Sequence, residues 1–215
     1  MRFDDAAARL AGLPAAAALP DGPAELMPVF TDGRLRPRLR PTTTAKPAAV
    51  LALLFPDEAG LARIVLTERR TYDGHHSGEV SLPGGKAEAV DGGDPSATAL
   101  REACEEVDLD AEAAGVRVVA TLGEVFIPVS DFRITPIVAV ADRAPALTPS
   151  EAEVARILTP RVSAFLPGAP IEIVERRIGD WPLRYGGYRI DGLHVWGATA
   201  RILGQLGAVL GSDSR

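Results

Sequence analysis

The sequence lacks the features that mark secreted, membrane-spanning and nucleic-acid-binding proteins. Cys104 is its single cysteine, so no disulfide can form within the chain and a reducing compartment is expected. No apolar run approaches the roughly 18 residues that a membrane span needs. The N-terminus is rich in alanine, but it opens with Asp4 and Asp5 and contains Pro14, whereas a secretory signal has a basic start. The net charge of −6 opposes binding to a nucleic-acid backbone. These absences predict a cytoplasmic protein.

What remains is ordinary globular composition, with 47% hydrophobic and 24% charged residues in 215. That length suits one domain with a real hydrophobic core. Residues 1–46 are expected to form a short helix followed by an irregular arm rich in proline and arginine. Residues 47–215 are expected to form the main domain.

Apolar runs and turn signals predict a mixed β-sheet with helices packed against it, an α/β fold. The dipeptide Asp191-Gly192 predicts the turn of a β-hairpin between 188–190 and 193–196. The other predicted strands span 48–55, 62–67, 116–122 and 134–140, and the predicted helices span 95–107, 150–158 and 198–210.

The predicted helix 95–107 carries unusually crowded acidic residues. It starts well, because Asp94 can cap it and Pro95 suits its first position. At 100° per residue, Glu102, Glu105 and Glu106 fall within about 100° of arc, with no lysine among them to relieve their repulsion. Leu100, Ala103, Cys104 and Val107 occupy the other side, where we expect core packing. The helix alone leaves open a solvated acidic face or a site for a divalent cation with oxygen ligands.

The residues before this helix favour the second alternative. Leu82-Pro83-Gly84-Gly85 forms a tight loop whose glycines allow the backbone to approach a ligand closely. Together with Arg101-Glu102-Ala103-Cys104-Glu105-Glu106-Val107, this loop resembles the Nudix box. Two departures stand out: the spacing from Gly85 to Arg101 is two residues longer, with Asp91 as the intervening acid, and Asp108 replaces the glycine after Val107.

The Nudix resemblance implies a fold, a cofactor and a set of ligands. The fold is an α/β/α sandwich with a mixed central β-sheet. The cofactor is Mg²⁺ or Mn²⁺, held by Glu102, Glu105 and Glu106 with help from the Gly85 carbonyl. Since all three glutamates are present, the resemblance favours an active diphosphatase over a Nudix fold that binds a nucleotide without cleaving it.

A second resemblance concerns the substrate. The segment from Leu66-Thr67-Glu68-Arg69 to Leu82-Pro83-Gly84-Gly85 is similar in spacing to the signature of coenzyme A diphosphatases, and 130–136 and 195–200 also resemble that subfamily. It differs at Gly74, where the signature has an arginine, and at Arg70 and Leu82. The resemblance implies cleavage of coenzyme A to 3′,5′-ADP and 4′-phosphopantetheine. Hydrolysis of ADP-ribose or NADH is the alternative.

The remaining site residues are assigned as expectations. Arg101 is expected to hold the glutamates in place through a salt bridge, with Asp91 as its partner. The general base is Glu105 or Glu153. A small-molecule diphosphate is the expected partner, without nucleic acid or membrane, and a homodimer stays open. The residues expected to contact the substrate are Arg69, His76, Gly78 and Gly84.

Overall fold

The computed structural model describes residues 1–13, 19–35, 41–70, 78–178 and 181–212. Its helical segments, in chain order, are α1 (Phe3–Ala11), η1 (Ala24–Leu26), η2 (Ala89–Asp91), α2 (Pro95–Val107), α3 (Ala111–Ala114), η3 (Val162–Phe165) and α4 (Gly197–Gly211). Its strands are β1 (Val29–Phe30), β2 (Lys46–Pro56), β3 (Ala62–Ile64), β4 (Leu66–Arg69), β5 (Val80–Ser81), β6 (Gly84–Lys86), β7 (Arg117–Thr121), β8 (Val125–Ile127), β9 (Phe132–Val140), β10 (Val154–Leu158), β11 (Glu172–Ile178), β12 (Trp181–Ile190) and β13 (Leu193–Val195). No helix in these ranges is both long and apolar enough to cross a membrane.

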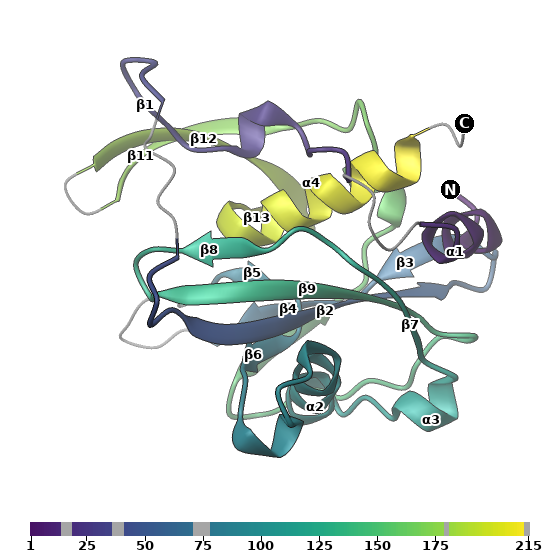
Figure 1. Cartoon of the computed structure of the whole chain (residues 1–215). Coiled ribbons are helices and arrows are strands. Elements are labelled where there is room, and N and C mark those ends of the chain that lie inside the picture. The colour runs from purple at the N-terminus through teal and green to yellow at the C-terminus, as the bar shows by residue number, and fades with distance from the viewer. Residues whose placement is uncertain (14–18, 36–40, 71–77, 179–180, 213–215) are drawn as a thin grey trace.

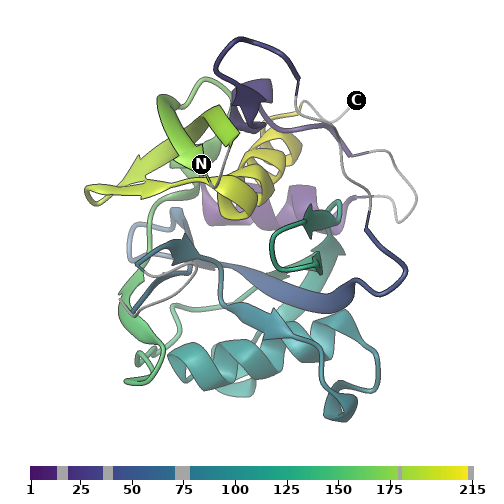
Figure 2. The same cartoon turned by 90° about the vertical axis from the view of Figure 1, so that its left-hand side faces the viewer.

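The central sheet has the strand order β3-β2-β9-β7, with β6 pairing β2 and β8 pairing β9. It is mixed, because β2 and β9 are parallel and the other pairs are antiparallel. The helix α2 covers one face and α4 the other (Figure 1), and the view turned by 90° shows the same order of layers (Figure 2). This arrangement confirms the predicted sandwich with a mixed central sheet.

The apolar run in β2 is explained by burial on both faces of the sheet. Leu51 and Leu53 belong to the core on the α2 side, whereas Ala52 and Leu54 belong to the larger core that contains α4. Alternate residues of one strand thereby hold both layers in place. The site described below depends on this, since the face of α2 is fixed by its packing on β2.

Two smaller sheets complete the fold. One has the order β10-β4-β5, and the other has β1-β12-β11 with β13 on β12. The predicted single strand 62–67 is in fact two strands, β3 on β2 and β4 between β10 and β5. The predicted hairpin is confirmed, with Asp191 and Gly192 both at positive φ. Within the arm expected to be irregular, β1 pairs with β12.

Two local predictions are wrong. The segment 150–158 is a turn followed by β10, not a helix, because its backbone pairs with β4 and it buries Val154 and Leu158. Cys104 is exposed rather than part of the core. The buried face of α2 instead includes Ala103 and Glu106, so the packing side is rotated toward the acidic residues.

Candidate active site

The helix α2 begins and ends as its sequence predicts. The Asp94 carboxylate accepts a hydrogen bond of 2.8 Å from the Ser96 N–H, and Pro95 follows at the first helical position. Asp108 ends the helix in the left-handed conformation, with φ of 54°. The side of α2 that packs on the sheet determines how deeply each of the three glutamates is buried. Glu106 is buried, Glu102 is half-buried and Glu105 is exposed.

Glu106 is the most unusual of the three, with only 3% of its surface exposed. Burial raises the pKa of Glu106 to about 7, against the opposing effect of Arg69 and with smaller contributions from Glu153 and Glu102. The Gly84 N–H donates to its carboxylate at 3.3 Å, and Arg69 Nη1 lies 3.9 Å from it. Because both contacts are long, they offset only part of the free-energy cost of burying the charged Glu106 carboxylate.

The segment 82–85, predicted as a tight loop and called the glycine loop here, in fact ends in strand β6, because Gly84 and Gly85 pair with β2. It lies directly against this acidic face. A side chain at Gly84 would overlap the backbone of β2, and φ there is 155°, which glycine adopts far more readily than other residues. A side chain at Gly85 would occupy the position of the Glu102 carboxylate. Close approach of the backbone therefore requires glycine at 84, whereas a side chain at 85 would displace the Glu102 carboxylate. Partial burial raises the pKa of Glu102, and Arg101 opposes this rise.

Arg101 connects the helix to the loop before it. Its Nε and Nη2 bind the two carboxylate oxygens of Asp91 at 2.9 and 3.2 Å, and Nη2 also donates to the Lys86 carbonyl at 3.0 Å. The same guanidinium reaches Glu102 at 2.9 Å and Glu105 at 3.1 Å. The partnership predicted between Arg101 and Asp91 is thus present, and Arg101 orients two of the three glutamates.

Asp91 is itself held from two further sides. It accepts hydrogen bonds of 2.8 Å from the Thr98 hydroxyl and from the Glu88 N–H. The hydrogen bonds from Arg101 hold the pKa of the Asp91 carboxyl far below its usual range. Thr98 was not assigned to the site from the sequence. The signal that could have identified it is its position on α2, one turn before Arg101. Gly92 and Gly93, which follow Asp91, are both at positive φ.

Glu153 lies on a separate segment, the turn before β10, which is held next to the acidic face of α2. The Ser150 N–H donates to the Glu106 carbonyl at 2.8 Å, which ties the turn before β10 to α2. The Arg70 N–H donates to the Glu153 carbonyl at 2.9 Å, and Val154 pairs with Arg69. The charge of Glu153 contributes to the raised pKa of both Glu102 and Glu106. Glu153 is exposed and lies close to the acidic cluster.

Arg69 is half-buried at the end of β4, and its Nε is buried without a hydrogen-bond partner among the residues that the structure describes. Gly78 turns the chain ahead of β5 with φ of 68°. His76, like His75, lies outside the described residues. The structure therefore brings together Arg69, Gly84, Gly85, Arg101, Glu102, Glu106 and Glu153, and sets Glu105 on the exposed rim.

The donor set is rich in hard oxygen, which suits Mg²⁺ or Mn²⁺. Within the described ranges, no three carboxylate, imidazole or thiol groups converge into a complete ligand set. Mg²⁺ does not require one, because it usually keeps several waters and binds one or two carboxylates plus substrate phosphates. Glu102, which lies against Gly85, and Glu106, which accepts from the Gly84 N–H, fit that requirement.

Comparison with known proteins agrees with this geometry. The family model described as the NUDIX domain matches residues 45–165. "Nudix hydrolase 22, chloroplastic" of Arabidopsis thaliana is 38% identical over 183 residues, covering 81% of this chain and 57% of that protein. "Uncharacterized Nudix hydrolase NudL" of Enterobacter sp. (strain 638) is 35% identical over 187 residues, covering 82% and 90%.

The chain thus spans little more than half of the plant relative's length. Among solved structures, the fold is similar to the crystal structure of a Nudix hydrolase from M. Smegmatis, RenU, at 27% identity and a TM-score of 0.47, over 56% of this chain and 73% of that one. Since the domain match covers more than half of the sequence and includes the glycine loop and the acidic helix, the chain belongs to the Nudix hydrolase family.

Proposed function

We propose that this protein hydrolyses the diphosphate bond of a nucleoside diphosphate derivative, with a divalent cation held by α2 and the glycine loop. The observation that carries the proposal is Glu106. It is a buried carboxylate whose neighbours neutralise it only partly, and it lies beside a backbone N–H and the half-buried Glu102. Perturbed carboxylates of this kind concentrate at functional sites.

A divalent cation would neutralise the acidic cluster better than the two nearby arginines do. Arg101 is already engaged by Asp91 and the Lys86 carbonyl, and Arg69 stays 3.9 Å from Glu106. Glu102 and Glu106 would hold the ion with the Gly85 carbonyl, and Glu105 would assist from the exposed rim. When bound, the ion supplies positive charge that neutralises the diphosphate and makes water more acidic.

The protein's own residues bind the substrate and move the proton. Arg69 lies beside Glu106 and its side chain is partly exposed, so its guanidinium can bind a phosphate oxygen. Gly84, Gly78 and His76 are also proposed to contact the substrate. Arg101 acts as a positioning residue, because it holds Glu102 and Glu105 while itself fixed by Asp91.

Hydrolysis requires a base for the attacking water. The water oxygen forms a new bond to phosphorus, the bridging P–O bond breaks, and the leaving phosphate keeps the electron pair while a carboxylate takes the proton. Glu153 is the proposed base, and support comes from its position on a separate segment and from the effect of its charge on Glu102 and Glu106. Glu105, which lies on the exposed rim and is bound by Arg101, is the alternative.

Coenzyme A is the proposed substrate. Support comes from the spacing between Leu66-Thr67-Glu68-Arg69 and Leu82-Pro83-Gly84-Gly85, which resembles the coenzyme A diphosphatase signature. Gly74, where that signature has an arginine, favours keeping a second candidate, an ADP-ribose or NADH diphosphatase. The two differ in the nucleotide bound and share the same hydrolytic centre.

The first prediction concerns the metal ligands. Glu106→Gln and Glu102→Gln keep the side-chain shape but remove the charge, so each should lower the rate about 10²-fold or more in saturating Mg²⁺. The melting temperature of Glu106→Gln should not fall, because a buried charge is removed. Glu58→Gln, in an exposed turn, is the matched control and should keep full activity. Near-full activity of both variants would refute these ligands.

The second prediction concerns the substrate. The wild-type protein, given coenzyme A, ADP-ribose and NADH with Mg²⁺, should cleave coenzyme A fastest. Mass spectrometry of the products should show 3′,5′-ADP and 4′-phosphopantetheine. Much faster turnover of ADP-ribose would move the protein to the second candidate and leave the hydrolytic centre unchanged.

The third prediction concerns the base. Glu153→Gln should reduce the rate by about 10²-fold and remove the acidic limb of the pH–rate profile, since a general base contributes on that order. Glu151→Gln, two residues earlier and also exposed, is the control and should leave the profile unchanged. If Glu153→Gln kept both rate and profile, the proton would go to Glu105 instead.

A further inference from the structure

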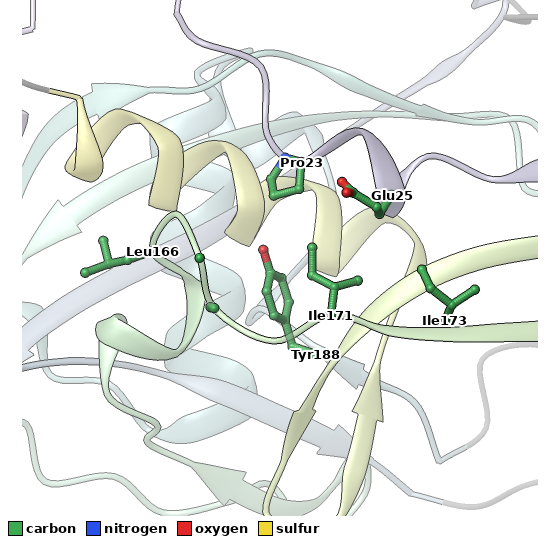
Figure 3. Close-up of a pocket in the computed structure, with 8 residues that line it drawn as sticks. Pro23, Glu25, Leu166, Ile171, Ile173 and Tyr188 are labelled. Carbon is green, nitrogen blue, oxygen red and sulfur yellow. The ribbon is translucent and has the colours of Figure 1, made fainter.

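The hollow beside Tyr188 offers a ligand no accessible polar group with a fixed orientation. It has a volume of about 450 Å³ and is formed by η1, the loop after η3, and strands β11 and β12, on the α4 side of the central sheet (Figure 1). In Figure 3 the hydroxyl end of Tyr188 points toward Pro23, but this oxygen is itself buried. Glu25, the charged residue of the lining, is exposed to solvent. A ligand would therefore find nothing in this hollow to fix its orientation.

On the other side of the sheet, a buried hydrogen bond joins Thr98 of α2 to Asp91 of the preceding loop. The Thr98 hydroxyl donates to Asp91 Oδ2 at 2.8 Å, and only 1% of Thr98 and 6% of Asp91 is exposed. The Asp94 carbonyl, one turn earlier on the helix, lies 3.4 Å from the same hydroxyl. Because a hydroxyl has one proton to donate, the shorter contact indicates that Thr98 bonds Asp91 rather than the helix backbone.

The Asp91 carboxylate is held to α2 at two points that differ in stiffness. Thr98 and Arg101 are three residues apart, so they are neighbours on the helix surface, and both bind Asp91. The threonine side chain is short and restricted at χ1, whereas the arginine side chain is long and has many rotamers. Thr98 therefore fixes where the Asp91 carboxylate lies relative to the helix, and Arg101 takes its orientation from that carboxylate.

Packing does little to hold the loop that carries Asp91. A side chain added at Gly92 or Gly93 would contact nothing, and both glycines are at positive φ. The side chain of Val90 is also largely exposed. Since glycine permits several backbone conformations, the loop sequence alone does not determine one position for the carboxylate. Its place depends mainly on the hydrogen bonds described above.

We propose that Thr98 is a positioning residue of the hydrolytic centre. Its hydroxyl fixes Asp91, which in turn fixes the Arg101 guanidinium. That guanidinium contacts Glu102 at 2.9 Å and Glu105 at 3.1 Å. This role rests on the proposed function, in which Glu102 holds the cation. Partners that orient metal ligands typically contribute about 10–100-fold to metal affinity, and Thr98 acts through two intermediate residues, so its effect should lie near the lower end.

The first test uses the full-length, metal-free protein and needs no substrate. The Arg101 Nε–H donates to Asp91 at 2.9 Å, and its NMR signal is assigned by its loss in Arg101→Lys. Thr98→Val keeps the side-chain shape and removes the hydroxyl, so exchange of the Arg101 Nε proton with water should quicken at least about fivefold. Thr98→Ser keeps a hydroxyl and is the matched control, with an exchange rate within about twofold of wild type.

The second test measures Mn²⁺ binding without substrate, from the EPR signal of the free ion, well below the melting temperature of each variant. Thr98→Val should raise the Kd for Mn²⁺ about tenfold, and Thr98→Ser should keep it within about twofold of wild type. In saturating Mn²⁺, the KM of Thr98→Val for the diphosphate that the wild type cleaves fastest should not change, because Thr98 does not contact the substrate.

A merely structural hydroxyl would give a different result. Thr98→Val would then lower the melting temperature but leave the Mn²⁺ Kd and the Arg101 exchange rate at their wild-type values, and that outcome would overturn the proposal. Thr98→Ser behaving like Thr98→Val would overturn it as well. Thr98→Ala, which also removes the hydroxyl, serves if Thr98→Val does not fold. Failure of the proposed function is distinct, because the wild-type protein itself would then neither bind Mn²⁺ nor hydrolyse a diphosphate.

Discussion

The ion pair between Arg101 and Asp91 joins the two segments on which the active site is built. Asp91 belongs to the loop that follows the glycines, and Arg101 belongs to the helix that carries the glutamates. Their side chains are only 2% and 19% exposed, so the pair is sheltered from solvent screening. Loss of one partner in such a pair is destabilising, because the other charge is left uncompensated. The same guanidinium then orients Glu102 and Glu105.

The acidic cluster on α2 is built at the expense of stability. Glu106 is buried next to other carboxylates, and its pKa is raised because burial disfavours its charged form. A helix that packed only for stability would place an apolar residue there. The helix tolerates Glu106 because Ala99, Ala103 and Val107 still bury their side chains against β2 and β9. A bound cation would recover part of this cost, so ligand binding and folding are linked.

The features that depend on neighbouring residues in the chain could be predicted from the sequence. The bounds of α2 follow from Asp94 and Pro95, and the hairpin follows from Asp191-Gly192, because caps and turns depend on a few adjacent residues. The strand β10 was predicted as a helix because its partner, β4, lies at least 85 residues earlier in the chain. Pairing between such distant segments cannot be detected from the local pattern of apolar residues. Cys104 was placed in the core for a related reason: the exact rotation of α2 is set by the sheet beneath it. The contacts of Thr98 and the approach of Glu153 likewise required the folded chain.

The proposed function depends on a cation held by α2 and the glycine loop. Crystals of the wild-type protein soaked in Mn²⁺, with diffraction recorded near the manganese absorption edge, test it directly. We expect an anomalous peak in contact with carboxylate oxygens of Glu102 and Glu106 and beside the Gly85 carbonyl. A preparation active with Mn²⁺ whose only anomalous peak lies elsewhere would contradict the assignment.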